Sequence, residues 1–231
     1  MSNRCTIWLL DGTTVTDVHG PTALLDEEER RQEASYRDET ARRSFVLRRS
    51  LAKNLLGASL GVPATAVQLT RQCAFCGHPS HGKPALLGRE LTFSVSWSGP
   101  WVAIAIAPQG EIGLDVEMLR GCDPTPDQWA AVLGPSIRPA DSSEQALLRT
   151  WTRKEAVLKC AGIGMAFSPD AVVVTQPDEP PAVVRIPERL GRPNGYRLYE
   201  LGTEPTVVMS VAADRATDID VCATSAPVSP L

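Results

Sequence analysis

Two acidic residues on one short apolar segment are the first feature of the chain that could do chemistry. Asp115 and Glu117 lie two residues apart in the segment IGLDVE at residues 112–117. On a strand, such residues point to the same face, so the carboxylates project together while Leu114 and Val116 face the core. The carboxylates repel each other unless a cation lies between them, and hard oxygen ligands suit Mg²⁺ together with substrate phosphates. An exposed polar strand face gives the same pattern, so the pair alone leaves both interpretations open.

A second candidate group lies in the segment WTRKEAVLK at residues 151–159. On a helix, Trp151, Glu155 and Lys159 follow one another along a single stripe. Glu155 could then be a third metal ligand, and Lys159 a phosphate-binding or proton-transferring group. The alternative is a simple i,i+4 ion pair between Glu155 and Lys159, worth ~0.3 kcal/mol.

A loop with two cysteines and two histidines gives the sharpest competing signal. Its candidate ligands are Cys73, Cys76, His78 and His81. A Cys-x-x-Cys pair is typical of half of a zinc site. However, the histidines follow at once, whereas in an ordinary finger they lie ~12 residues further on. Beside zinc, the remaining interpretation is a loop that stiffens the approach to Lys83.

The elements that must position these residues show both strand and helix patterns. Alternating or apolar runs predict strands at 6–10, 91–96, 101–106, 111–117, 171–175, 182–186, 196–201 and 207–212. Helical spacing and capping residues predict helices at 26–35, 38–60 and 142–161, with a short one near 128–133. This order indicates an α+β fold of two similar lobes, residues 1–109 and 110–212, with the active site in the cleft between them. Residues 213–231 are expected to be an irregular tail.

Composition excludes several classes of protein. The 231 residues carry a formal net charge of -4, which argues against a general nucleic-acid binder. No run approaches the ~18 apolar residues of a membrane span, and the first residues lack the apolar core of a secretory signal. Six cysteines in an unexported chain favour reduced thiols or a metal site over disulfides, and isolated ones such as Cys5 and Cys160 are expected to be packing residues. We therefore expect a cytoplasmic protein with no nucleic-acid or membrane partner.

The two acidic segments together resemble the signature pair of the 4′-phosphopantetheinyl transferases. The family pattern is an apolar residue, Gly, an apolar residue, Asp, any residue and Glu, then Trp, two residues, Lys-Glu-Ala and a Lys. Residues 112–117 and 151–159 fill every position. Upstream, GKPAL at 82–86 and FSVSWSG at 93–99 resemble two further family segments, and residues 41–51 resemble its arginine-bearing helix. Length and the two-lobed pattern resemble the single-chain surfactin-synthetase-activating group rather than the short trimeric acyl-carrier-synthase group.

The resemblance implies an Mg²⁺-dependent enzyme that moves the phosphopantetheine arm of coenzyme A onto a serine of an apo acyl or peptidyl carrier protein, releasing 3′,5′-ADP. The carrier could belong to fatty-acid, polyketide or nonribosomal peptide biosynthesis. The implied fold is a pseudo-dimer of the two lobes, and hence a monomer. The implied metal ligands are Asp115, Glu117 and Glu155. The implied catalytic residues are Glu155, Lys159 and Asp115, with Lys159 on the phosphate chain. The implied nucleotide-binding residues are Arg43, Lys83, Ser96 and Trp97, with Lys159.

Two departures from the family pattern stand out. Trp97 occupies a position where the family commonly has His, and an indole carries no charge and has a single N–H donor. It could instead stack on the adenine or on a neighbouring side chain. The acid that often follows the metal strand is missing from residues 132–138. The general base would then be Glu155, Glu117 or a water.

Helix 38–60 concentrates basic residues opposite its apolar face, namely Arg42, Arg43, Arg48, Arg49 and Lys53. This face would be either a docking surface for an acidic carrier or a solvated basic face. The alternative function for the whole chain is a non-enzymatic module, in which a zinc-bound loop organises a protein interaction and coenzyme A binding is vestigial. Trp97 and the missing acid favour this alternative, whereas the intact carboxylate and lysine set disfavours it.

Overall fold

The computed structural model describes residues 4–14, 22–71, 82–88, 91–121, 125, 127, 130, 133–134, 143–163, 167–202, 204–214 and 220–224, the last segment as backbone only. The first half contains β1 (Arg4–Asp11), α2 (Glu27–Ser35), α3 (Glu39–Leu60), β2 (Leu69–Arg71), β3 (Pro84–Leu86), β4 (Thr92–Ser98) and β5 (Trp101–Ala107). The second half contains β6 (Ile112–Met118), α5 (Glu144–Cys160), β7 (Val173–Val174), β8 (Val183–Arg185), β9 (Tyr196–Leu201), β10 (Val207–Asp214) and β11 (Asp220–Thr224). The predicted α+β class is confirmed.

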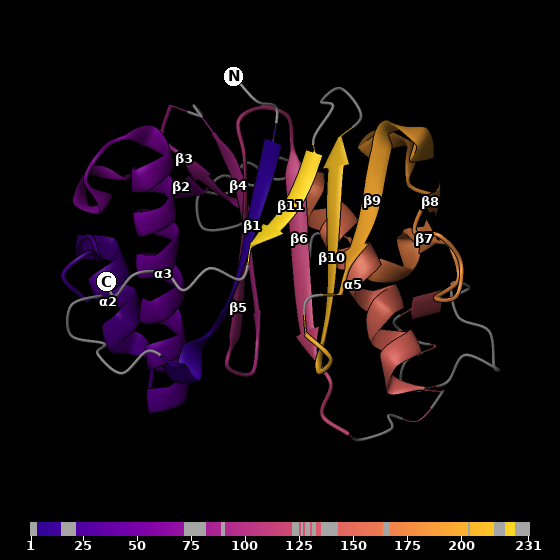
Figure 1. Cartoon of the computed structure of the whole chain (residues 1–231), viewed down its shortest axis with the longest axis horizontal. Helices are drawn as coiled ribbons and strands as arrows, with labels where there is room; N and C mark the ends of the chain where they lie inside the picture. The colour runs from indigo at the N-terminus through magenta and orange to yellow at the C-terminus, as the bar shows by residue number, and fades with distance from the viewer. Residues whose placement is uncertain are drawn as a thin grey trace.

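Two sheets pack face to face between two long helices (Figure 1). One sheet has the strand order β11-β1-β5-β4 and the other the order β6-β10-β9. A buried apolar cluster from β1, β5, β6 and β10 fills the space between the sheets. Helix α3 packs on the outer face of the first sheet, and α5 covers the outer face of the second. Each sheet thus has both faces covered by apolar side chains, which is the main stabilising contribution in such layered folds.

Polar caps set the limits of the two long helices. Asp38 caps α3 by accepting a hydrogen bond from the backbone N–H of Ala41, and Gly61 ends the helix at a φ of 70°. Ser143 caps α5 in the same way, through the N–H of Ala146. Both helices therefore begin and end within two residues of their predicted limits.

The prediction of an irregular tail over residues 213–231 is wrong in two places. Strand β10 continues to Asp214, and residues 220–224 form β11. Strand β11 pairs in parallel with β1, from Arg4 opposite Asp220 to Trp8 opposite Thr224. The reason is non-local, because β1 would otherwise be a sheet edge with unpaired backbone groups. The C-terminal segment therefore completes the sheet that the N-terminus begins, and the boundary near residue 109 stays a prediction.

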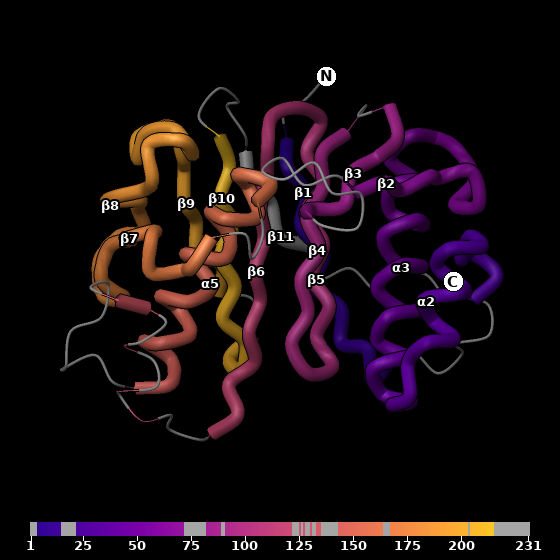
Figure 2. The backbone as a smooth tube through the Cα atoms, turned by 180° about the vertical axis from the view of Figure 1, so that it is seen from behind, coloured from indigo at the N-terminus to yellow at the C-terminus, as the bar shows by residue number. Residues whose placement is uncertain are grey.

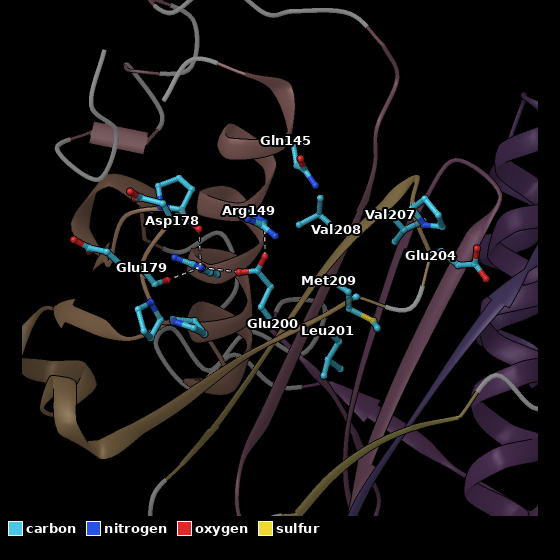
Figure 3. A pocket seen from close by; sticks show the side chains of 16 residues that line it. Gln145, Arg149, Asp178, Glu179, Glu200, Leu201, Glu204, Val207, Val208 and Met209 are labelled. Carbon is cyan, nitrogen blue, oxygen red and sulfur yellow. Dashed lines mark hydrogen bonds and ion pairs between the residues drawn. The ribbon is translucent and has the colours of Figure 1, made fainter. Parts of the chain in front are cut away.

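A buried arginine holds the loop after β7 against β9. The Arg153 side chain is 1% exposed and donates to Glu200 Oε2 at 2.6 Å and to the carbonyl oxygen of Gln176 at 2.7 Å. Arg149, one turn earlier on α5, pairs with the other oxygen of Glu200 at 2.5 Å but is 40% exposed. These residues border a pocket of about 710 Å³ between α5, β9, β10 and the proline-containing loop (Figure 3). Two arginines therefore share one carboxylate in different surroundings.

This shared carboxylate allows a matched comparison of stability. We expect Arg153→Ala to lower the free energy of unfolding by about 3–5 kcal/mol, because Glu200 Oε2 and the loop carbonyl oxygens lose their buried donor, although Arg149 still binds the other oxygen of Glu200. Arg149→Ala should lower the free energy of unfolding by less than about 1 kcal/mol, since the Arg149 side chain is largely exposed to water. Urea unfolding of the two variants measures the difference. An equal loss of unfolding free energy in both variants would contradict a stabilising role for the buried Arg153.

Candidate active site

The carboxylates of the IGLDVE segment lie on β6 and face α5. Leu114 and Val116 are fully buried in the core between the sheets, as the alternation predicts. Asp115 is buried as well, whereas Glu117 is partly exposed. Because β6 is the edge strand of its sheet, side chains from β4 can also reach these carboxylates. Asp115 and Glu117 therefore lie at a position where neighbouring elements contact them, and not on an exposed polar strand face.

Helix α5 supplies the second half of the site. Lys159 Nζ donates to Asp115 Oδ1 at 2.6 Å and to Ser96 Oγ at 3.0 Å. Glu155, one turn earlier, is buried beside them. Lys159 thus pairs with Asp115 on β6, so the interpretation as a simple ion pair with Glu155 within the helix is wrong.

A row of serines on β4 connects the two sheets at this point (Figure 2, where β4 and β6 run side by side). Ser96 Oγ donates to Asp115 Oδ1 at 2.7 Å, and Ser98 Oγ donates to Glu117 Oε2 at 2.6 Å. Ser94 Oγ accepts the backbone N–H of Leu114 at 2.9 Å. Ser94 and Ser98 were not among the predicted site residues, although the alternation in FSVSWS places them on the same face as Ser96.

Three carboxyl groups, those of Asp115, Glu117 and Glu155, lie near the positive charge of Lys159. Burial, followed by the charge of Asp115, raises the pKa of Glu155 to about 7. Burial also raises the pKa of Glu117, with a smaller contribution from Asp115. Within the described part of the chain, the buried atoms Asp115 Oδ2 and Glu155 Oε1 have no hydrogen-bond partner. Buried carboxylate oxygens without a hydrogen-bond partner, on groups whose pKa is raised, are suited to binding a cation.

In the described part of the chain, the same carboxylates are not arranged as a complete set of metal ligands. Among the residues with described positions, no group of three or more His, Cys, Asp or Glu side chains is arranged to hold a metal ion. One oxygen of Asp115 is bound by Lys159 and Ser96 instead. The donor chemistry fits a hard divalent cation, and the assignment of ligands remains a prediction.

The predicted nucleotide-binding residues do not gather in one place. Lys83 Nζ is bound to Glu111 Oε2 at 3.1 Å and to the carbonyl oxygen of Ile112 at 2.5 Å. Arg43 lines a pocket of about 270 Å³ next to the β4–β5 turn. Trp97 lines a different pocket, where Arg48 stacks on its ring. The structure therefore places Ser96 and Lys159 in the carboxylate site, Lys83 at the start of β6, and Arg43 and Trp97 at two different pockets, so a common nucleotide site stays a prediction.

The single basic face predicted for α3 is wrong. Lys53 is only 3% exposed and binds Glu29 Oε2 at 2.5 Å. Arg49 approaches the other oxygen of Glu29 at 3.6 Å, and Arg42 pairs with Glu39 and Glu33. The physical reason is that α2 contacts α3 through an acidic residue that spacing within α3 cannot reveal. This helix therefore does not present a uniform docking surface for an acidic carrier.

Several expectations fall on other parts of the chain. The cysteines and histidines of the predicted zinc loop, Cys73, Cys76, His78 and His81, lie outside the described residues, as does most of 132–138. Cys5 and Cys160 are buried, and burial raises the pKa of each thiol to about 12, which fits packing roles. Of the helices in the described ranges, none has the length and apolar character needed to cross a membrane.

Comparison with known sequences identifies the class of protein that carries this site. Residues 111–210, which include β6, α5 and β10, match the family model of the 4′-phosphopantetheinyl transferase superfamily. The match covers less than half of the chain. The enzyme class that it and the relatives below support for the chain is 4′-phosphopantetheinyl transferase.

Individual relatives carry the same class name. The chain is 29% identical to the 4′-phosphopantetheinyl transferase HetI of Nostoc sp. over 74% of its own length and 70% of that protein. It is 28% identical to a putative 4′-phosphopantetheinyl transferase of Synechocystis sp. over 83% and 77% of the two chains. It is 33% identical to the 4′-phosphopantetheinyl transferase AcpT of Salmonella typhi, over 42% of this chain and 53% of that one. The first two alignments extend beyond the matched segment toward the rest of the chain.

Proposed function

We propose that the chain transfers the 4′-phosphopantetheine arm of coenzyme A to a serine of an apo acyl or peptidyl carrier protein. The serine oxygen forms a bond to the β-phosphorus, the bond from that phosphorus to the bridging oxygen breaks, and 3′,5′-ADP leaves. The main support is the meeting of Asp115, Ser96 and Lys159 from β6, β4 and α5 beside two further carboxylates. Phosphoryl transfer requires charge neutralisation and alignment more than covalent help, and these residues can provide both.

Mg²⁺ is the cation that we propose for the site, held by Asp115, Glu117 and Glu155. When bound, such an ion neutralises charge on the phosphate oxygens. Support comes from the uncapped oxygens Asp115 Oδ2 and Glu155 Oε1, which are suited to a hard cation.

Lys159 and Glu155 have separate roles in this proposal. Lys159 is 23% exposed, so its ammonium group can bind the phosphate chain while remaining near Asp115. Glu155, a buried carboxylate one turn before Lys159, accepts the proton of the attacking serine, directly or through a water that it orients.

The wider assignment follows the same resemblance. We place the chain in the surfactin-synthetase-activating group, as a cytoplasmic monomer whose two helix-covered sheets are the lobes of a pseudo-dimer. The carrier would come from fatty-acid, polyketide or peptide synthesis. The support is that each sheet carries one long helix on its outer face, α3 or α5.

A carrier-labelling assay tests the proposed function. The chain is mixed with coenzyme A, Mg²⁺ and a panel of apo acyl and peptidyl carriers, and the intact mass of each carrier is measured. We expect at least one carrier to gain the mass of a single phosphopantetheine arm, and to lose this gain when EDTA removes the metal. Binding of coenzyme A without labelling of any carrier would instead support the non-enzymatic module.

Ser98 provides a prediction about how the carboxylates are positioned. Because its hydroxyl holds Glu117 Oε2, Ser98→Ala should weaken metal binding about tenfold, as expected for a residue that orients a ligand. Mn²⁺ binding followed by electron paramagnetic resonance measures this directly, and Ser98→Thr, which retains the hydroxyl, should restore most of the affinity. Unchanged Mn²⁺ affinity in Ser98→Ala would show that Glu117 needs no such support.

A further inference from the structure

The ammonium group of Lys159 holds one oxygen of a carboxylate that we propose as a metal ligand. Its Nζ lies 2.6 Å from Asp115 Oδ1 and 3.0 Å from Ser96 Oγ. Ser96 Oγ in turn donates to the same oxygen of Asp115 at 2.7 Å. Lys159 and Ser96 therefore both bind Asp115 Oδ1, so a cation that uses the full carboxylate of Asp115 must share it with the lysine.

The two oxygens of Asp115 have different surroundings. Oδ1 has two donors, whereas the buried Oδ2 has no hydrogen-bond partner among the described residues. Glu155 Oε1 is likewise buried without a partner in that part of the chain. A divalent cation on these oxygens and the ammonium group of Lys159 bind the same carboxylate, and two positive charges repel each other strongly where water is largely excluded.

Lys159 can leave Asp115 by rotation of its own side chain. The Lys159 side chain is 23% exposed and flexible, whereas that of Asp115 is 5% exposed. Lys159 also lies in the last turn of α5, where the helix dipole favours a positive charge whether or not the ion pair is formed. When Lys159 moves, Ser96 still donates to Asp115 Oδ1, so this buried oxygen keeps a partner and the contact costs less to break.

We propose that Lys159 competes with the divalent cation for Asp115, and that the phosphate chain of coenzyme A relieves this competition by drawing Lys159 away. The inference rests on the proposed function, in which both ligands bind at this site, and it adds a link between them. A contact that opposes one ligand and is broken by another couples their binding, and each ligand then raises the affinity for the other by the same factor. The chain would therefore hold the cation weakly until coenzyme A is bound.

The alternative is a permanent ion pair, in which Lys159 simply stabilises Asp115. Such a pair would leave Asp115 Oδ2 and Glu155 Oε1 buried without partners, and each of these atoms then costs free energy. A divalent cation carries twice the charge of an ammonium group and can bind several carboxylate oxygens at once. The two interpretations differ in their consequence, because removal of Lys159 strengthens cation binding under competition and weakens or preserves it under permanent pairing.

Mn²⁺ binding followed by electron paramagnetic resonance tests the proposal without requiring turnover. In the absence of coenzyme A, we expect Lys159→Met to bind Mn²⁺ about tenfold more tightly than the unmodified chain, because the competing charge is removed. Lys159→Arg, which retains the charge, should bind Mn²⁺ about as weakly as the unmodified chain. Arg149→Met, which removes a positive charge from the same helix at a residue paired with Glu200, is the matched control and should leave Mn²⁺ affinity unchanged.

A second set of titrations measures the coupling between the two ligands. Saturating coenzyme A should strengthen Mn²⁺ binding in the unmodified chain by a factor about ten times larger than in Lys159→Met, because only the unmodified chain has a lysine to displace. A titration of coenzyme A with Mn²⁺ in the absence of protein corrects for direct binding of the ion to the phosphates.

Several outcomes would overturn the proposal. Unchanged or weaker Mn²⁺ binding in Lys159→Met would show that the lysine supports the carboxylates, and equal coupling in both chains would show that coenzyme A does not act through it. Failure of both chains to bind Mn²⁺ would leave nothing for Lys159 to compete with. Thermal unfolding checks that each variant is folded, and Lys159→Gln serves as a second uncharged variant. The carrier-labelling assay reports separately on the proposed function: a chain that labels no carrier, while Lys159→Met binds Mn²⁺ more tightly, would contradict the function alone.

Discussion

The Asp115→Asn variant is expected to lose transfer activity by about a thousandfold while remaining folded. The substitution removes the negative charge but keeps an oxygen that can accept from Ser96 and Lys159. A metal ion contributes several kcal/mol of transition-state charge stabilisation, and each ~1.4 kcal/mol corresponds to a tenfold change in rate. The measurement is the rate of carrier labelling at saturating coenzyme A, together with thermal unfolding.

Two further measurements separate the metal role of Asp115 from a structural one. Mn²⁺ binding should weaken in Asp115→Asn, and added Mg²⁺ should recover part of the lost rate. Glu204→Gln, which changes an exposed carboxylate in the turn between β9 and β10, should label carriers at the normal rate. Near-normal turnover of Asp115→Asn, or a loss explained by unfolding, would count against the carboxylate site.

The carboxylate site was predictable because its parts are local in sequence. Alternation along β6 is enough to place Asp115 and Glu117 on one face and Leu114 on the other, and the structure agrees. Helical spacing likewise places Glu155 and Lys159 one turn apart. The two pairs of residues meet because α5 packs on β6. The family resemblance implied this packing, whereas the local sequence pattern did not.

The features that could not be predicted depend on contacts between distant segments. The partner of Lys53 is Glu29 on α2, so a residue that looks solvated on a helical wheel is buried. Strand β11 forms because the edge of β1 is open to it. Arg71 lines a pocket of about 330 Å³ together with Arg48 and Arg49 of α3, and it does so from a three-residue strand with no motif of its own. In each case the pairing residue lies on another element, where periodicity gives no information.

Gly113 shows why the family signature needs a glycine before its acidic residues. A side chain at this position would meet the carbonyl oxygen of Ala156 at 2.0 Å and the backbone nitrogen of Cys160 at 2.3 Å. Both are backbone atoms of α5, so no change of rotamer can relieve the overlap. The glycine thus allows α5 to lie directly on β6, and this close approach brings Lys159 to Asp115.

Gly113→Ala should therefore damage both stability and the site. We expect the free energy of unfolding to fall by about 3 kcal/mol, which corresponds to a melting temperature ~10 °C lower for a chain of this size. The part of the protein that remains folded should also bind Mn²⁺ more weakly, because α5 must shift away from β6. Gly195→Ala is the matched control, since a Cβ there meets no atom within 4 Å. Normal stability with normal Mn²⁺ binding in Gly113→Ala would mean that the α5–β6 contact does not set the geometry of the carboxylate site.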